Sequence, residues 1–311
     1  DLPLAIALGI VLLLVVLAGP VAGFPQSPGL THTSPGALMP GKAQELTVHG
    51  ANLLGATNLW TGFGARILSA NATNASAAKF QVSLPADTPV GIHAVRVASV
   101  NGGSSPLLLM VDDLPSVADK AANVRSTNAQ PLAWPVAVDG AAVSLGCKFY
   151  RVTVKAGDRL AIEVVAQRLG SKLDPVLRLL DLRGRELAFC DDESGLGGDC
   201  RLVHVFAGGG DHLIEVRDIN FSGGGDYRFR LRVGDFPLAS LPFPAAVKAG
   251  AQRTFDFVGP QVDKLKPVTA TAPLDAMRLA LSAKFPGGKS STFVSALVSD
   301  TAEFADAEPN D

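Results

Sequence analysis

The chain has 311 residues, enough for two or three domains, and 18% of them are charged. Its formal net charge of −2 lacks the basic excess of proteins that bind a phosphate backbone, so we expect no nucleic-acid partner. The 32 glycines and 21 prolines show no collagen-like period and favour many short strands joined by frequent turns. The composition therefore predicts an all-β protein.

The first 23 residues carry an export signature. An uninterrupted apolar run extends from Leu4 to Gly19 and is followed by small residues at 21–23. The run is short for a membrane span and suits a secretory signal peptide cleaved near Gly23; an uncleaved membrane anchor is the alternative. No initiator Met or basic stretch precedes the run, so the natural chain is expected to begin upstream. Both interpretations predict an exported protein that is secreted, periplasmic or at the cell surface.

Residues 24–112 are expected to form a first, smaller β domain. The runs KAQELTVHGANL after Gly41 and IHAVRVASV suit strands, and PADTPVG supplies the proline and glycine of a tight connection. The order of these pieces resembles the IPT/TIG immunoglobulin-like domains of secreted and surface proteins. The resemblance depends on PADTPVG and on NGGSS at Asn101 to Ser105, and it implies an Ig-like sandwich.

Residues 113–130 contain Pro, Asp and Asn and are interpreted as a linker that leaves the domains semi-independent. Residues 131–234 then form the central domain. From Phe149 to Val233 it consists of short alternating runs bounded by Gly, Asp or Pro, the pattern of half-buried strands and their turns. This pattern predicts one β-sandwich.

The last strand of the central domain alternates most clearly. Its apolar residues point one way, and Arg228, Arg230 and Arg232 point the other way, so we expect an outward-facing arginine stripe. Such a stripe could bind carboxylates or sulfates of an acidic polysaccharide. The alternative is a solvated outer face whose arginines pair with carboxylates of neighbouring strands.

Residues 235–300 repeat features of the first domain. The stretch SSTFVSALVSDTAEFADAEPN lines up with SSPLLLMVDDLPSVADKAAN, and AQRTFDFVG after Gly250 matches KAQELTVHG after Gly41. Such self-similarity predicts a second, shorter Ig-like domain. Residues 301–311 then begin the next linker, and the natural protein is expected to continue.

The central domain resembles the bacterial pre-peptidase C-terminal domain, a jelly-roll-like sandwich found beside secreted peptidases and in long surface proteins. The resemblance is carried by AGDRLAIEV, LDPVLRLLDLRGREL, DDESG and GGGDHLIEV. His212 and Cys147 depart from the family pattern. Together with the two Ig-like copies, the resemblance implies a large secreted, multi-domain bacterial protein.

The acidic loop of the central domain offers a candidate metal site. It gathers oxygen ligands of the kind that Ca²⁺ prefers, and some relatives of this fold bind calcium, but the spacing is not that of the D-x-D-x-D-G loop. The alternative is a solvated turn. The candidate ligands are Asp191, Asp192, Glu193 and Asp199.

Two cysteines bracket this loop. In an exported protein, a Cys190–Cys200 disulfide would close a loop of about ten residues and stabilise the fold by about 3 kcal/mol. Cys147 would be left over, although the spacing does not exclude it as the partner of either one.

No catalytic motif is present. The chain contains neither an H-E-x-x-H pair nor a G-x-S-x-G elbow. No histidine is assigned a catalytic or ligand role; the five are His32, His49, His93, His204 and His212.

The sequence therefore predicts a non-catalytic secreted or surface protein that serves as an adhesion, binding or spacer module. Its partner would be an extracellular polymer, a polysaccharide or a protein, with membrane contact only through an uncleaved N-terminal segment. The alternative is the accessory region of a secreted peptidase or other hydrolase whose catalytic domain lies outside this chain.

Overall fold

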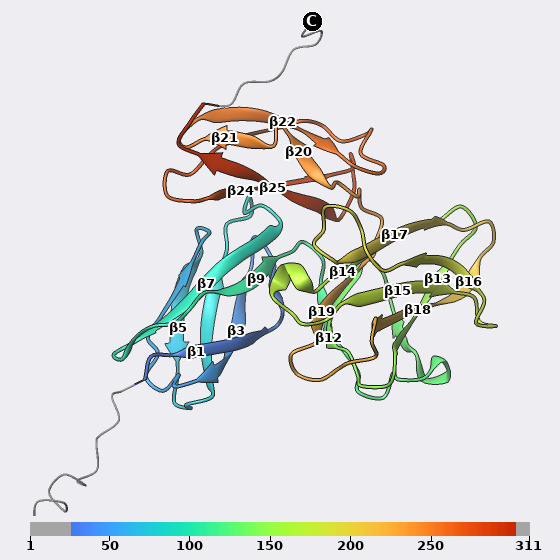
Figure 1. The fold of residues 1–311 in the computed structure, drawn as a ribbon, viewed down its shortest axis with the longest axis horizontal. Helices are drawn as coiled ribbons and strands as arrows, with labels where there is room; N and C mark the ends of the chain where they lie inside the picture. Colours follow the sequence, from blue (N-terminus) through green and yellow to red (C-terminus); the bar gives the residue numbers. More distant parts are fainter. Residues whose placement is uncertain (1–25, 303–311) are drawn as a thin grey trace, which may run out of the picture.

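A computed structural model describes residues 26–302. The predicted signal segment and nearly all of the predicted C-terminal linker lie outside the described residues. Within them, the regular elements are β-strands and two short 3-10 helices, η1 (Ser126–Asn128) and η2 (Gln167–Leu169), which confirms the all-β class. The strands form three β-sandwiches (Figure 1). No helix among these residues is long and apolar enough to cross a membrane.

The first sandwich packs the sheet β1-β3-β6-β5 against the sheet β2-β9-β7-β4, with β8 paired to β7. In β3, Leu46 and Val48 enter the core, while Thr47 and His49 face outward, because side chains alternate along a strand. The strands are β1 (Gly29–Ser34), β2 (Ala37–Leu38), β3 (Ala43–Ala51), β4 (Asn58–Thr61), β5 (Arg66–Asn71), β6 (Ala77–Ser83), β7 (Gly91–Ser99), β8 (Gly102–Gly103) and β9 (Leu107–Val111).

The central sandwich packs the sheet β10-β12-β19-β14-β17 against the sheet β11-β13-β18-β15-β16. Phe229, Leu231 and Val233 of β19 enter its core, as their alternation predicts. The segment interpreted as a linker adds β10, which runs parallel to β12. The strands are β10 (Ser116–Ala118), β11 (Gln130–Leu132), β12 (Val136–Ala141), β13 (Lys148–Val154), β14 (Arg159–Val165), β15 (Pro175–Leu180), β16 (Glu186–Cys190), β17 (Cys200–Val205), β18 (Gly210–Asp218) and β19 (Arg228–Gly234).

The third sandwich has two three-stranded sheets, β20-β22-β23 and β21-β25-β24. Its short strand β21 runs parallel to the last strand β25, just as β2 runs parallel to β9 in the first sandwich. Leu279 and Leu281 of β24 are buried on one face, because alternate side chains of a strand point to the same side. The strands are β20 (Leu241–Phe243), β21 (Ala246–Lys248), β22 (Gln252–Val258), β23 (Val268–Thr271), β24 (Arg278–Lys284) and β25 (Ser291–Ser299).

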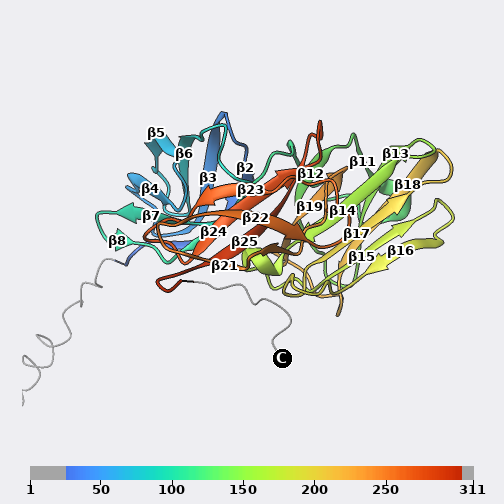
Figure 2. The ribbon, with the colours of Figure 1, turned by 90° about the horizontal axis from the view of Figure 1, so that it is seen from above.

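The third sandwich lies across the other two, and all three meet at one junction (Figures 1 and 2). An apolar cluster at this junction takes Ala37, Val90 and Met110 from the first sandwich, Val165 from the central one and Phe293 from the third. The domains are therefore joined by packed side chains as well as by the connecting chain.

Arg230 and Arg232 lie inside this junction, so the expectation that they face outward is wrong. Their side chains are 1% and 0% exposed. Asp112, directly after β9, accepts hydrogen bonds from Arg230 at 2.8 Å and from Arg232 at 3.1 Å. Arg232 also donates to Glu163 and to the carbonyl of Ser291, both at 2.6 Å. The neighbouring domains cover the face that alternation turns away from the core. The partners that a buried charge requires come partly from those domains, through Asp112 and Ser291, and partly from Glu163 of the central sandwich itself.

Candidate ligand-binding cleft

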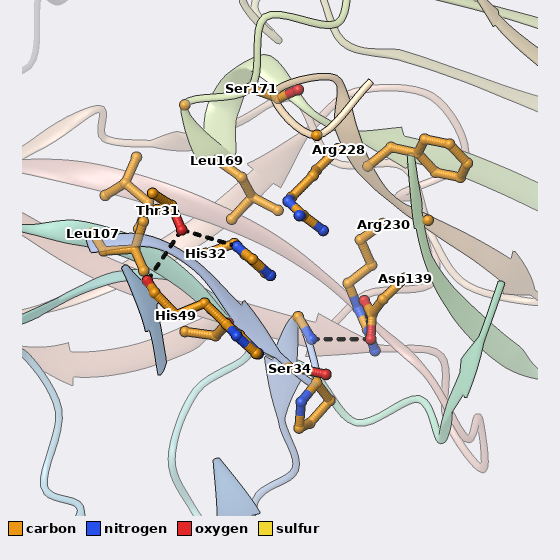
Figure 3. A pocket seen from close by; sticks show the side chains of 18 of the residues that line it. Thr31, His32, Ser34, His49, Leu107, Asp139, Leu169, Ser171, Arg228 and Arg230 are labelled. Carbon is orange, nitrogen blue, oxygen red and sulfur yellow. Dashed lines mark hydrogen bonds and ion pairs between the residues drawn. The ribbon is translucent and has the colours of Figure 1, made fainter. Parts of the chain in front are cut away.

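A cleft of about 1030 Å³ opens between the first and central sandwiches (Figure 3). One wall comes from β1 and from the outward face of β3. The opposite wall comes from β10, from residues 169–172 after β14 and from the start of β19. The cleft exists because the edge of one sandwich packs beside the outer face of the other, so neither domain forms it alone.

Two histidines lie together on the wall of the first sandwich. His32 and His49 occupy paired positions on β1 and β3, and their rings stack with centroids 4.3 Å apart and an interplanar angle of 5°. The Thr31 hydroxyl lies 3.0 Å from Nδ1 of His32. Burial, then the charge of Arg228 and then the neighbouring imidazole lower the pKa of His32 to about 4. At neutral pH the stack is therefore uncharged.

Arg228 projects from the opposite wall toward His32 (Figure 3). It is the first residue of β19, and partial burial lowers the pKa of its guanidinium from the ordinary arginine value. Within residues 26–302, its side chain makes no hydrogen bond or ion pair. Of the three arginines in the predicted stripe, Arg228 alone is exposed.

The other charged side chains of the cleft already have partners among the residues described. The pairs are Glu45 with Lys79 at 3.0 Å, Asp226 with Lys172 at 2.7 Å and Asp139 with Arg230 at 2.7 Å. Asp139 also accepts a hydrogen bond from the backbone N–H of Gly36, which ties the first sandwich to the central one. Arg228 is thus the surplus cation of the cleft.

The cleft offers groups that can bind a ligand. Each carboxylate in the cleft is held in an ion pair, so none is positioned as an unpaired general base. A guanidinium with all its donors free, beside imidazoles and side-chain hydroxyls, can instead hold an oxygen-rich ligand.

The four predicted calcium ligands do not converge. Asp199 is buried, and its carboxylate accepts hydrogen bonds from the backbone N–H groups of Ala166 and Gln167 and from Arg168. Glu193 pairs with Arg201 at 3.2 Å. Asp191 and Asp192 remain at the surface, and the described part of the chain contains no group of three His, Cys, Asp or Glu side chains that could hold a metal ion. Asp199 and Glu193 instead fasten the loop to the sandwich.

The predicted disulfide partners are adjacent free thiols. Cys190 ends β16 and Cys200 begins β17, strands that border opposite sheets of the central sandwich. A hydrogen bond from Cys200 lowers the pKa of the Cys190 thiol to about 7, whereas burial raises the pKa of Cys200 well above its usual value. The structure places these two thiols together and Cys147 elsewhere, in an environment of charged side chains that includes Glu215.

Sequence reasoning did not find the cleft. It singled out Arg228, but as part of an outward stripe, and it assigned no role to His32 or His49. Strand pairing brings these histidines together and domain packing brings Arg228 opposite them. Neither step leaves a spacing motif in the sequence.

Comparisons with known proteins do not assign a family. No protein-family model matches the chain, and no curated protein matches it. The solved structures to which the chain is similar include the pre-peptidase C-terminal domain of a Bacillus anthracis collagenase, at 13% identity and a TM-score of 0.27, covering 34% of this chain and 93% of that one.

A second similar structure is SGBP-B of the Bacteroides ovatus mixed-linkage glucan utilization locus, in complex with a mixed-linkage heptasaccharide. It is 10% identical with a TM-score of 0.24, over 61% of this chain and 74% of that one. A third similar structure contains the M60 catalytic domain and two CBM51 domains of Clostridium perfringens ZmpB. It is 8% identical with a TM-score of 0.22, over 84% of this chain and 40% of that one. TM-scores this low support no conclusion about what this chain binds, and the IPT/TIG resemblance stays a prediction.

Proposed function

We propose that this chain is a non-catalytic binding module of an exported protein and that its ligand is a segment of an extracellular polymer held in the cleft. The observation that carries the proposal is the cleft itself, built from two sandwiches and lined by an unpaired guanidinium, two imidazoles and several hydroxyls. Its volume exceeds that of a single ion or small metabolite and lies at the upper end of ordinary ligand sites.

The junction supports this proposal because it holds the two walls in place. Asp112, which follows the first sandwich, is ion-paired to Arg230 and Arg232 of the central one, and Arg232 also contacts the third sandwich. A binding site whose walls are preorganised loses less entropy when a ligand binds. The predicted export signature supports a location where extracellular polymers occur.

A binding screen with a blocked cleft tests the proposal. Thr47→Trp adds a bulky side chain to the cleft wall, and Thr254→Trp makes the same change on an exposed strand of the third sandwich. Affinity electrophoresis against a set of neutral and charged polysaccharides should show retardation of the wild type and of Thr254→Trp, and its loss in Thr47→Trp. Retention of binding in Thr47→Trp would remove the cleft as the site, and no binding to any polymer would overturn the proposed function.

A further inference from the structure

We propose that the ligand of the cleft is an anionic polysaccharide and that one of its carboxylate or sulfate groups lies between Arg228 and the His32–His49 stack. This inference rests on the proposed function and narrows it to a ligand class. It assigns a binding role to three side chains that come from two different domains.

The unpaired positive charge in the cleft favours an anionic ligand. Arg228 is exposed in the cleft, and its side chain has no ion-pair partner within residues 26–302, so all of its N–H donors are available to a ligand. Its planar fork can bind a carboxylate or sulfate through two parallel hydrogen bonds. Because Arg228 points toward His32 across the cleft, a bound anion would contact both walls.

The charge density favours a polysaccharide over an acidic peptide or a nucleic acid. The other ionic groups of the cleft are internally paired, so the site offers one surplus cation and would not neutralise a dense run of anions. Side-chain hydroxyl groups also line the cleft, and a hydroxyl can both donate and accept a hydrogen bond, which matches the hydroxyls of a sugar chain. They belong to Thr31, Thr33, Ser34, Thr47, Ser116 and Ser171.

Protonation of the histidines would be coupled to binding. His32 faces the hydroxyl of Thr31 on β1, His49 on β3 and Arg228 on β19. The other charged groups that line the cleft belong to the Glu45–Lys79, Lys172–Asp226 and Asp139–Arg230 pairs. An anion placed at Arg228 offsets the charge that disfavours His32 protonation, so the pKa of His32 must rise in the complex. Affinity should therefore increase as the pH falls, by at most about tenfold per pH unit for each proton taken up.

Calorimetric titration of the whole chain tests the ligand class. The probes are partly methyl-esterified oligogalacturonates, whose free carboxylates are widely spaced, a sparsely sulfated galactan oligosaccharide, a neutral glucan oligosaccharide of equal length and poly-glutamate. We expect Arg228→Gln to weaken binding of the preferred anionic sugar by about 10- to 100-fold. Arg228→Lys should weaken it less, because the charge remains while the bidentate geometry is lost. Arg183→Gln, at an exposed arginine of the β15–β16 turn, is the matched control and should bind like the wild type.

Histidine NMR supplies an independent readout. Adding the preferred oligosaccharide should raise the pKa of His32 and leave that of His204, on β17 outside the cleft, unchanged. An unchanged His32 pKa at saturating ligand would overturn the placement of the anion.

The outcomes separate this inference from the proposed function. Equal binding of the neutral glucan, abolished by Thr47→Trp but not by Arg228→Gln, would leave the cleft as the site and refute the anionic class. Binding of poly-glutamate as tight as that of the sugars would replace the polysaccharide by an acidic peptide. The comparison of galacturonate with sulfated galactan decides which anionic group the site prefers.

Discussion

Replacing Asp112 by alanine should destabilise this protein more than any other single carboxylate removal at the junction. Asp112 is completely buried and lies between two guanidinium groups, with Arg230 at 2.8 Å and Arg232 at 3.1 Å. Its pKa is lowered because the two arginines outweigh the burial that would raise it. Asp112→Ala leaves both arginines buried with only part of their counter-charge.

The size of the destabilisation depends on the carboxylates that still pair with the two arginines in Asp112→Ala. Arg230 keeps Asp139 at 2.7 Å and Arg232 keeps Glu163 at 2.6 Å, so neither guanidinium becomes fully isolated. Removing one partner of a buried ion pair costs about 3–5 kcal/mol of unfolding free energy. At about 2–4 °C per kcal/mol, the midpoint of thermal unfolding should fall by about 6–20 °C.

Urea unfolding and scanning calorimetry measure this effect, with Asp87→Ala as the control at an exposed carboxylate that makes no ion pair in the described chain. The double variant Asp112→Ala/Arg232→Met should recover part of the loss. The second substitution removes the Arg232 guanidinium, which would otherwise stay buried without Asp112 as a partner, while Glu163 keeps its ion pair with Arg168 at 2.8 Å. If Asp112→Ala unfolds within about 0.5 kcal/mol of the wild type, the reasoning that these arginines require Asp112 is refuted.

Three further predictions concern acid, thiol reactivity and a close backbone approach. Burial acts to raise the pKa of Glu163, but Arg168 and Arg232 lower it to about 2, below the usual 4.5. The stabilising contribution of Glu163 should therefore be complete above pH 4.5 and lost as the pH falls toward 2. The unfolding free energies of the wild type and of Glu163→Gln should converge over that pH range. In the reduced chain at pH 7.5, Cys190 should react with a thiol reagent faster than Cys147, because burial raises the pKa of Cys147 to about 11. Glutathione disulfide should join Cys190 to Cys200 with release of two glutathione thiols. Mass spectrometry of peptides checks both outcomes, and a disulfide to Cys147 would contradict the prediction. Gly223→Ala should cost about 1–3 kcal/mol in urea unfolding, because the added methyl group meets the backbone at residues 143–144, whereas Gly225→Ala, with open space at its Cβ, should cost less.

Local pattern was sufficient to establish the class of fold and the inward face of its strands. Phe229, Leu231 and Val233 occupy the core of the central sandwich because a period-2 sequence can bury only one face of a strand. Turn chemistry similarly predicted where strands end, and the repeat predicted a second, shorter copy of the first domain. In the structure both of these domains have a short strand parallel to their last strand. These features depend on neighbours in the sequence, so the sequence by itself determines them.

Tertiary packing decided what the opposite faces contact. Arg228, Arg230 and Arg232 share one side of β19, yet the neighbouring domains cover the last two and leave the first at the edge of a cleft. The fate of the acidic loop was decided in the same way, since the carboxylate of Asp199 turns inward to Arg168 and two backbone N–H groups. Alternation specifies that a side chain points away from its own core, but only the position of another domain determines whether it meets water, a carboxylate or a ligand.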